Sequence, residues 1–338
     1  MLFAPIGPEG QRRLAAARVA IVGCGALGTA QADLLARAGV GAGTGWLRLI
    51  DRDYVEASNL QRQTLFDEAD AAAGLPKAVA AQGRLSRVNS GIRIEPAVAD
   101  LTPGNAEELL GGNDVILDGT DNAETRYLLN DFAVARGVPW VYGAAVASRG
   151  LTFTVIPEAT ACLACVFPGE PEQVPAPITD TCETSGVLSW VVSWVAAVQT
   201  AEAVKLLVGD RSALRRTVLS CDLWRNQFRE FEPVRDSECR ACARRDFIHL
   251  RGEGRAAVTL CGRNAVQIHE HRQKLDLAAL ADRLRGVGEV RGNAWALRFF
   301  PATPADMEMT IFPDGRALIK GTVDAGVARS LYARYIGA

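Results

Sequence analysis

Two C-x-x-C pairs stand far apart in this chain, Cys162 with Cys165 and Cys239 with Cys242. Each pair presents two thiolates on one side of a tight turn, and four such thiolates form a tetrahedral zinc site. A shared zinc ion would clip two distant segments together, so these pairs constrain the fold more than any other feature does. The alternative is that each pair forms a disulfide or a redox centre.

The composition is that of a globular protein with a large core. The chain has 338 residues, of which 49% are hydrophobic and 22% are charged. The net charge of -2 gives no sign of a nucleic-acid or membrane-surface partner. The first residues lack the pattern of a signal peptide, and the most apolar segment, 187–208, contains Gln199, Glu202 and Lys205. We therefore expect a cytoplasmic protein, and a reducing compartment favours zinc over disulfides.

A glycine-rich turn follows the first apolar run. The segment 18–28 predicts a buried strand that turns on Gly23, Gly25 and Gly28 into a helix, and these glycines form a G-x-G-x-x-G motif. A second apolar strand then leads to Asp51. This order of elements is typical of the βαβ unit of nucleotide-binding folds.

Further strands and helices alternate along the chain. We expect strands at 92–98, 114–117 and 139–142 and helices at 78–88, 106–110 and 124–136. These elements predict an α/β fold with a doubly wound, Rossmann-like sheet, held by the four-cysteine zinc clip. Strands after Arg149 would extend the sheet.

Two changes of composition divide the chain. Prolines exclude regular structure from 167–186, where we expect a crossover loop that carries Cys182. Arginines and glycines at 244–256 mark a linker between a large domain over 1–243 and a small α+β domain over 257–338. In the small domain we expect strands at 258–268, 294–299, 308–312 and 317–320 and helices at 277–284 and 326–335.

Charged residues after Asp51 indicate a ligand with more phosphate charge than a dinucleotide has. Arg62 and Lys77 are cations, and the triphosphate of ATP needs more neutralisation than the two phosphates of NAD. Asp118 and Asp121 close a later strand, at the edge where ligands of doubly wound sheets bind, and one of them can hold Mg²⁺. The glycine motif alone also fits an NAD-dependent oxidoreductase, but the chain lacks recognisable hydride-transfer groups.

Together these motifs resemble the ThiF/MoeB family, the bacterial relatives of the ubiquitin-activating enzymes. The resemblance covers residues 2–243, and it is carried by the glycine turn, both cysteine pairs and the segments 51–53, 58–63, 74–77 and 121–126. The segments 260–268 and 312–317 resemble a C-terminal extension of some ThiF-type members. The chain is therefore most like ThiF.

The resemblance implies a nucleotidyltransferase. Members of the family bind Mg-ATP and adenylate the C-terminal glycine carboxylate of a ubiquitin-like sulfur carrier ending in Gly-Gly. We expect a ThiS-like carrier and a role in thiazole synthesis for thiamine. The alternatives are a MoaD-like carrier for molybdopterin synthesis and, from another class, a non-catalytic carrier-binding subunit.

The resemblance also implies roles for single residues. The nucleotide-binding residues would be Gly23, Gly25, Gly28, Asp51, Asn59, Arg62, Gln63, Lys77, Asp121 and Asn122. Asp51 would hold the ribose hydroxyls, Arg62 and Lys77 would act in catalysis on the phosphates, and Asp121 would act there as the Mg²⁺ ligand. Cys182 would form an acyl disulfide or thioester with the carrier, the alternative being an idle loop cysteine. Zinc would be structural, because four thiolates leave no open coordination position.

Two departures from the family pattern concern the nucleotide site. Ala26 stands where the family usually has a second glycine, and we expect this change to be tolerated. The family commonly begins with a segment whose arginine reaches the ATP of the partner subunit, and the chain begins after the matching position. We expect a start upstream of Met1; the alternatives are that Arg12 or Arg13 substitutes, or that the phosphates have one cation fewer.

Family members form homodimers, and we expect one here. Trp190 and Trp194 are four residues apart on an apolar helix. We assign them to the core or to the dimer interface, and docking of the carrier is the alternative.

Overall fold

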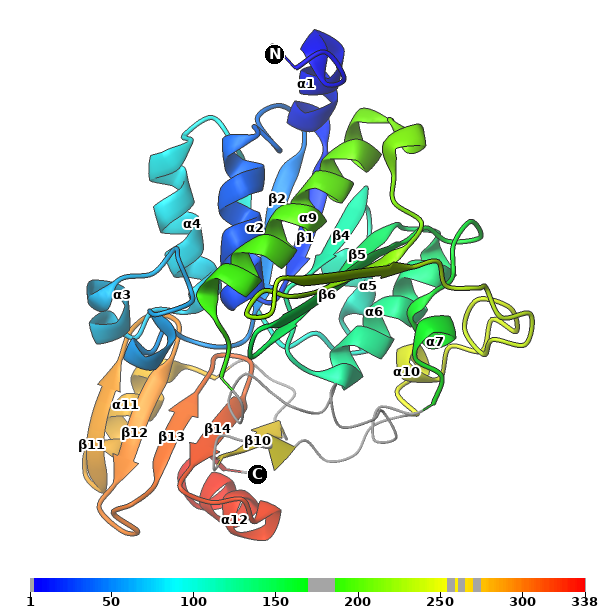
Figure 1. Cartoon of the computed structure of the whole chain (residues 1–338). Helices are drawn as coiled ribbons and strands as arrows, with labels where there is room; N and C mark the ends of the chain where they lie inside the picture. Colours follow the sequence, from blue (N-terminus) through cyan, green and yellow to red (C-terminus); the bar gives the residue numbers. More distant parts are fainter. Residues whose placement is uncertain (1–2, 170–185, 254–258, 261–264, 270–274, 338) are drawn as a thin grey trace. The chain divides into compact units, whose positions relative to one another are not determined.

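The structure is a computed structural model that describes residues 3–169, 186–253, 259–260, 265–269 and 275–337 (Figure 1). The chain forms two compact units, Met1–Gly254 and Arg255–Ala338, called here the large and the small unit.

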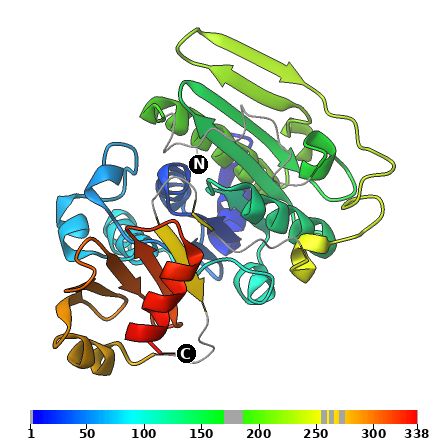
Figure 2. The same ribbon diagram turned by 90° about the horizontal axis from the view of Figure 1, so that it is seen from below.

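The large unit is built on an eight-stranded sheet with the strand order β3-β2-β1-β4-β5-β6-β7-β8. The first five strands in this order are parallel and the last three are antiparallel to their neighbours. The hairpin of β7 and β8 forms one edge (Figure 2). The strand bounds are β1 Arg18–Val22, β2 Trp46–Asp51, β3 Ile94–Val98, β4 Val115–Asp118, β5 Trp140–Val146, β6 Arg149–Val155, β7 Val218–Asp222 and β8 Gln227–Phe231.

Helices cover both faces of this sheet. Successive residues of a strand point to opposite faces, so Val19 and Ile21 pack with one set of helices and Ala20 and Val22 with the other. Burial on both faces explains why the parallel strands are nearly continuous hydrophobic runs. The first face is covered by α1 Gly7–Ala16, α2 Ala26–Arg37, α4 Lys77–Val88 and α9 Ser189–Val208, and the second by α5 Ala106–Leu110 and α6 Ala123–Arg136. Shorter helices are η1 Ala57–Asn59, α3 Glu68–Ala73, α7 Leu163–Val166, η3 Arg211–Ala213 and α10 Ile248–Arg251.

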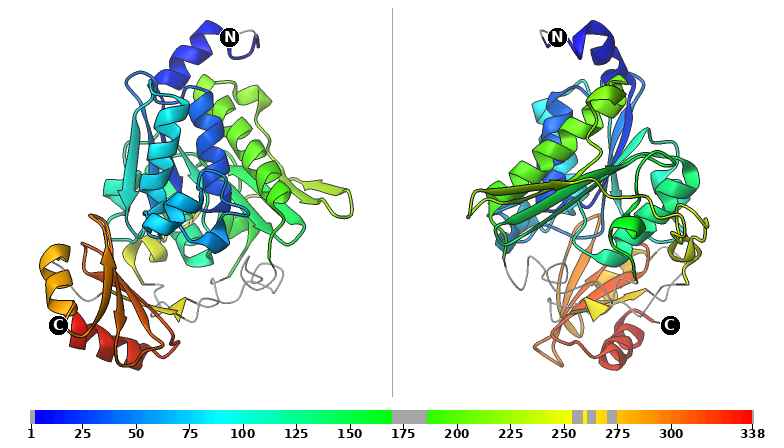
Figure 3. Two further views of the ribbon diagram at one scale, coloured as in Figure 1. Left: turned by 90° about the vertical axis from the view of Figure 1, so that its left-hand side faces the viewer. Right: turned by 45° about the vertical axis from the view of Figure 1, so that its right-hand side comes forward.

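Helix α9 is long and apolar enough to span a membrane. The buried core helix of a soluble protein can have the same length and hydropathy. It runs beside α2 and packs on β5 and β6 (Figure 3). Its buried side chains include the polar Gln199 and Glu202. Gln199 donates hydrogen bonds to the carbonyls of Asp118 and Val141, so α9 is tied to the middle of the sheet.

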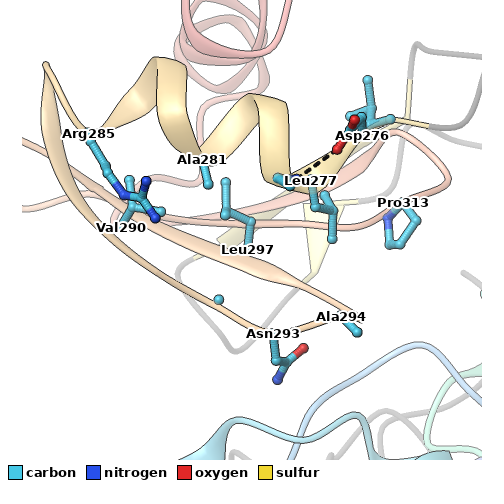
Figure 4. Close-up of a pocket in the computed structure, with 12 residues that line it drawn as sticks. Asp276, Leu277, Ala281, Arg285, Val290, Asn293, Ala294, Leu297 and Pro313 are labelled. Carbon is cyan, nitrogen blue, oxygen red and sulfur yellow. Dashed lines mark hydrogen bonds between the residues drawn. The ribbon is translucent and has the colours of Figure 1, made fainter.

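The small unit has a six-stranded antiparallel sheet with the strand order β11-β12-β13-β14-β10-β9. Helices α11 Leu277–Leu284 and α12 Ala325–Tyr335 pack their apolar side chains against it. Between α11 and the β11–β12 hairpin lies a mostly apolar cavity of about 550 Å³, with Asp276 at one end and Arg285 at the other (Figure 4). The strand bounds are β9 Thr259–Leu260, β10 Ala265–His269, β11 Gly288–Gly292, β12 Leu297–Pro301, β13 Glu308–Ile311 and β14 Arg316–Lys320.

The predicted fold class is confirmed. Helices α5 and α11 have the bounds that we expected, and the other predicted elements differ by a few residues. The segment 258–268, expected to be one strand, contains two described strands, β9 and β10, which pair with each other in antiparallel register. Strand β11 was not predicted, because its sequence, GEVRG, has glycine at both ends and one apolar residue.

Candidate functional site

Three glycines allow two turns of the backbone to touch. Gly23 has a φ of +91°, a conformation that glycine adopts without strain. A Cβ atom on Gly28 would lie 1.8 Å from the Gly23 carbonyl oxygen, and a Cβ atom on Gly119 would lie 2.5 Å from the same oxygen. The β1–α2 turn and the turn after β4 therefore meet only because these positions lack side chains. Gly119 was not among the predicted site residues. The feature that could have indicated it in the sequence is its place directly after Asp118, the acid that ends β4.

Gly25 has a different role in this turn. A Cβ atom there would meet nothing closer than 3.9 Å, so the space beside it is open. Gly25 is the N-cap of α2. The first backbone N–H groups of a helix lack partners within the helix, and together with the helix dipole they favour an anion. The open space and the helix end suit a phosphate group.

Asp51 ends β2 beside the glycine turn, and its carboxylate is fixed by the backbone. One oxygen accepts the N–H of Cys24 at 2.6 Å and the other accepts the N–H of Asp53 at 2.6 Å. Burial raises the pKa of Asp51, and the neighbouring Lys77 opposes that rise. An acid held in this position at the end of β2 is where a nucleotide ribose is bound in doubly wound folds.

Two cations lie at the same end of the sheet. Lys77, the first residue of α4, is 4% exposed, and its Nζ is 3.3 Å from Oδ2 of Asp53. Arg52 pairs with Asp100 at 3.2 Å and with Asp53 at 3.8 Å. Burial lowers the pKa of Arg52, but Asp100, Asp53, Asp121 and Asp51 together raise it above its usual value. Arg52 and Asp53 were not among the predicted site residues, although both lie in the segment 51–53 that carries the family resemblance.

The segment after β2 carries the other predicted nucleotide ligands. Asn59 and Gln63 are buried, at 6% and 3% exposure, and the N–H of Gln63 donates to the Asn59 carbonyl at 3.0 Å. Arg62 is half-buried, and its guanidinium donates to the Ser58 carbonyl at 3.1 Å. The Oε1 atom of Gln63 is buried without a hydrogen-bond partner among the described residues. The Gln63 amide nitrogen would lie 4.0 Å from a Cβ atom on Gly25, so this orphaned amide stands at the glycine turn.

The acid that ends β4, Asp118, and the acid in the loop after it, Asp121, have different surroundings. Both carboxylate oxygens of Asp118 are engaged, one by Thr120 and the other by Arg126. Asp121 is exposed, and Asn122 accepts the N–H of Thr125 as the N-cap of α6. Asp121 is therefore the carboxylate of this loop that can reach a cation.

The predicted nucleotide residues thus gather at the carboxyl ends of β1, β2 and β4. Between β1 and β4 the strand order reverses, and ligands of doubly wound sheets bind at this point. An open helix N-terminus and cationic side chains fit a phosphorylated nucleoside. Carboxylate oxygen is a ligand that Mg²⁺ prefers, so Asp121 fits that ion.

The four cysteines of the two C-x-x-C pairs meet in the large unit. Their sulfur atoms all lie within 4.8 Å of one another. Three of the separations are 3.6 Å (Cys162 to Cys239), 3.4 Å (Cys165 to Cys242) and 3.9 Å (Cys162 to Cys165). Zinc–sulfur bonds of about 2.3 Å in a tetrahedron put sulfur atoms about 3.8 Å apart, whereas a disulfide needs about 2.0 Å. The four sulfurs fit one zinc ion and no disulfide.

Helix α6 supports both halves of this cluster. Asn130 accepts the N–H of Leu163 at 2.8 Å, and its amide nitrogen lies 3.7 Å from the Cys162 sulfur. Asp131 is fully buried and accepts two hydrogen bonds from Arg240, at 3.1 and 3.2 Å. Such surrounding hydrogen bonds orient metal ligands. The cluster is held from α6 on both sides.

The remaining predicted site residue, Cys182, lies outside the described residues, as does most of the predicted crossover loop. Helix α9 begins at Ser189, soon after the predicted loop ends at Gly186, and its Trp190 is 52% exposed. Trp194 is half-buried, with its ring 5.9 Å from that of Phe228 on β8, which is 56% exposed. Aromatic surface is therefore exposed at this end of α9.

Comparisons with known proteins identify the family of this chain. The profile of the ThiF family matches residues 1–241. The sulfur carrier protein ThiS adenylyltransferase of Bacillus subtilis is 45% identical to this chain, over 99% of this chain and 97% of its own. A sulfur carrier protein adenylyltransferase of Thermus thermophilus is 37% identical over 72% of this chain and 88% of its own. The crystal structure of E. coli MccB with ATP has the same fold, with a TM-score of 0.59 at 22% identity over 69% of each chain.

Proposed function

The chain belongs to the ThiF family, and on that premise we propose that it is an ATP-dependent adenylyltransferase for a ubiquitin-like sulfur carrier. The reaction joins the C-terminal glycine carboxylate of the carrier to AMP and releases pyrophosphate. The observation that carries the proposal is the 45% identity to the B. subtilis ThiS adenylyltransferase over nearly the whole of both chains.

A ThiS-like carrier is the preferred substrate. The similarity to the B. subtilis enzyme extends through the small unit, whereas the T. thermophilus relative is matched over 72% of this chain. A MoaD-like carrier is less favoured. The carrier would deliver sulfur for the thiazole of thiamine.

The proposed chemistry needs positive charge more than it needs a base. The attacking carboxylate is already ionised near neutral pH, and it must approach a triphosphate of the same sign. Lys77 and Arg62 would neutralise the phosphates, and the N-terminus of α2 would bind one of them. Asp51 would accept hydrogen bonds from the ribose, and the Gln63 amide would lie beside the bound nucleotide at the glycine turn.

We assign Mg²⁺ to Asp121, where it would supply charge neutralisation on the departing pyrophosphate. Zinc would be structural, bound by Cys162, Cys165, Cys239 and Cys242. Retention of Arg62, Lys77 and Asp121 argues against the alternative of a non-catalytic carrier-binding subunit.

We further propose that the protein acts in the cytoplasm as a homodimer, and that Cys182 forms the acyl disulfide or thioester with the carrier. The thiols of the zinc cluster suit a reducing compartment. The exposed Trp190 and the half-buried Trp194 offer aromatic surface of the kind that is enriched in interfaces.

Exchange of radiolabel between pyrophosphate and ATP tests the proposal. The purified full-length chain, loaded with zinc, would be mixed with Mg²⁺, ATP and either a ThiS-like or a MoaD-like carrier ending in Gly-Gly. We expect exchange with the ThiS-like carrier, and none with the same carrier lacking its last glycine. Exchange with only the MoaD-like carrier would assign the protein to molybdopterin synthesis instead of thiazole synthesis. Absence of exchange with both carriers would contradict adenylation.

A further inference from the structure

The loop between β4 and α6 is held by a buried ion pair. Asp118, the last residue of β4, is fully buried, and Arg126, one turn into α6, is 11% exposed at its side chain. The Nε of Arg126 lies 3.1 Å from Oδ2 of Asp118. Two buried charges are costly unless they are paired and fully hydrogen-bonded, so this pair fixes its surroundings.

Asp118 and Arg126 both form hydrogen bonds with the same loop residue, Thr120. Asp118 Oδ1 accepts the Thr120 N–H at 2.8 Å and its hydroxyl at 2.7 Å. Arg126 Nη2 donates to the Thr120 carbonyl at 2.7 Å and to the Gly143 carbonyl, on β5, at 3.0 Å. The backbone on both sides of Thr120 is thus bonded to one ion pair.

The pair is itself anchored to the middle of the sheet. The guanidinium of Arg126 lies 5.1 Å from the centre of the buried Tyr142 ring. The backbone carbonyl of Asp118 accepts hydrogen bonds from Gln31 of α2 and Gln199 of α9, each at 2.9 Å. Burial would lower the pKa of Arg126, but Tyr142, Asp118 and Asp121 raise it above its usual value, so the guanidinium stays charged.

Asp121 is the residue directly after Thr120, and it is exposed. Its direction is therefore set by a backbone that Arg126 and Asp118 hold. We propose that Arg126 is a positioning residue for adenylation, which keeps the Asp121 carboxylate aimed at the divalent cation through the Thr120 carbonyl. This inference rests on the proposed function, because that function supplies the role of Asp121.

The variant Arg126→Lys tests the proposal, because its ammonium group keeps the charge but cannot bridge Asp118, Thr120 and Gly143 at once. The second variant is Asp118→Asn, which keeps an acceptor for Thr120 and removes the charge. The matched control is Arg240→Lys, since Arg240 also pairs with a fully buried aspartate of α6, Asp131, away from the loop.

Two readouts would be taken on the full-length, zinc-loaded protein. The first is binding of Mn²⁺ in the presence of α,β-methylene-ATP, followed by electron paramagnetic resonance without a carrier. The second is the Mg²⁺ dependence of pyrophosphate exchange with the carrier. We expect Arg126→Lys and Asp118→Asn to weaken metal binding about tenfold and to lower kcat about 10- to 100-fold, with the KM for the carrier unchanged. Arg240→Lys should lower the melting temperature and leave the metal requirement unchanged.

The proposal is overturned if Arg126→Lys behaves like Arg240→Lys, losing stability with a wild-type metal requirement. It is also overturned if neither variant at the pair folds, because the pair would then support the whole domain. Failure of the proposed function is separable from both results. A wild-type protein that binds Mn²⁺ with the analogue but catalyses no exchange would contradict adenylation, and the Mn²⁺ binding of the variants would then still show whether Arg126 positions Asp121 for the metal.

Discussion

The Nζ atom of Lys77 lies 3.3 Å from Oδ2 of Asp53, so this buried lysine is held at the carboxyl end of β2 by an acid two residues after that strand's last residue, Asp51. A buried ammonium group without a counter-charge would lose its proton or leave the interior. Asp53 therefore supplies a counter-charge for the buried Lys77 before any ligand arrives.

Removal of this cation should slow the reaction far more than it weakens the fold. We expect Lys77→Ala to lower the exchange rate about 100-fold or more, because one fixed charge on a developing anion is lost. The control is Arg37→Ala, which removes an exposed cation paired with Asp33 on α2. Wild-type exchange by the Lys77 variant would show that other cations neutralise the phosphates.

Substitution of two glycines of the G-x-G-x-x-G motif should have different effects, one on stability and one on ATP binding. We expect Gly28→Ala to destabilise the protein by about 3 kcal/mol or more, since its Cβ would overlap the Gly23 carbonyl. Gly25→Ala should fold with a melting temperature close to that of the wild type but bind ATP at least tenfold more weakly, because its Cβ would occupy the open space at the N-terminus of α2. Calorimetry measures both quantities. Tight ATP binding by Gly25→Ala would move the nucleotide away from this turn.

Zinc should be present at one equivalent per chain. We expect Cys239→Ser to release the metal and to lower the melting temperature by about 10 °C, because structural zinc contributes several kcal/mol and each is worth about 2–4 °C in a domain of this size. Elemental analysis and thermal unfolding check both effects. Cys221→Ala, which removes a buried thiol outside the cluster, should keep its zinc. Full zinc occupancy in the Cys239 variant would contradict a four-cysteine site.

The proposed dimer should depend on the exposed aromatic surface of α9. We expect Trp190→Glu to convert the dimer to a monomer at micromolar concentration, because a charge would then be buried in an apolar interface. Light scattering measures the mass directly. The matched control is Trp295→Glu, which changes an exposed tryptophan of the small unit. A monomeric wild-type protein would contradict the dimer, and an unchanged dimer in the Trp190 variant would move its interface elsewhere.

Local patterns in the sequence predict much of this fold. Apolar runs such as 18–22 become central strands because both faces of the sheet are covered, and glycine before a helix marks the nucleotide turn. Contacts between distant residues leave no such pattern. Three contacts depend on how separate strands and helices are brought together. They join Gly119 with Gly23, Asp53 with Lys77, and Arg126 with Thr120. Most residues of the candidate site could therefore be predicted from the sequence, but the contacts by which they position one another could not.

Helix α6 is held near its start and at its middle. Arg126 ties its first turns to the loop of Asp121, and Asn130 and Asp131 tie later turns to the cysteine cluster. Because these two sets of contacts are separate, a substitution that weakens one of them leaves the other to hold the helix in place.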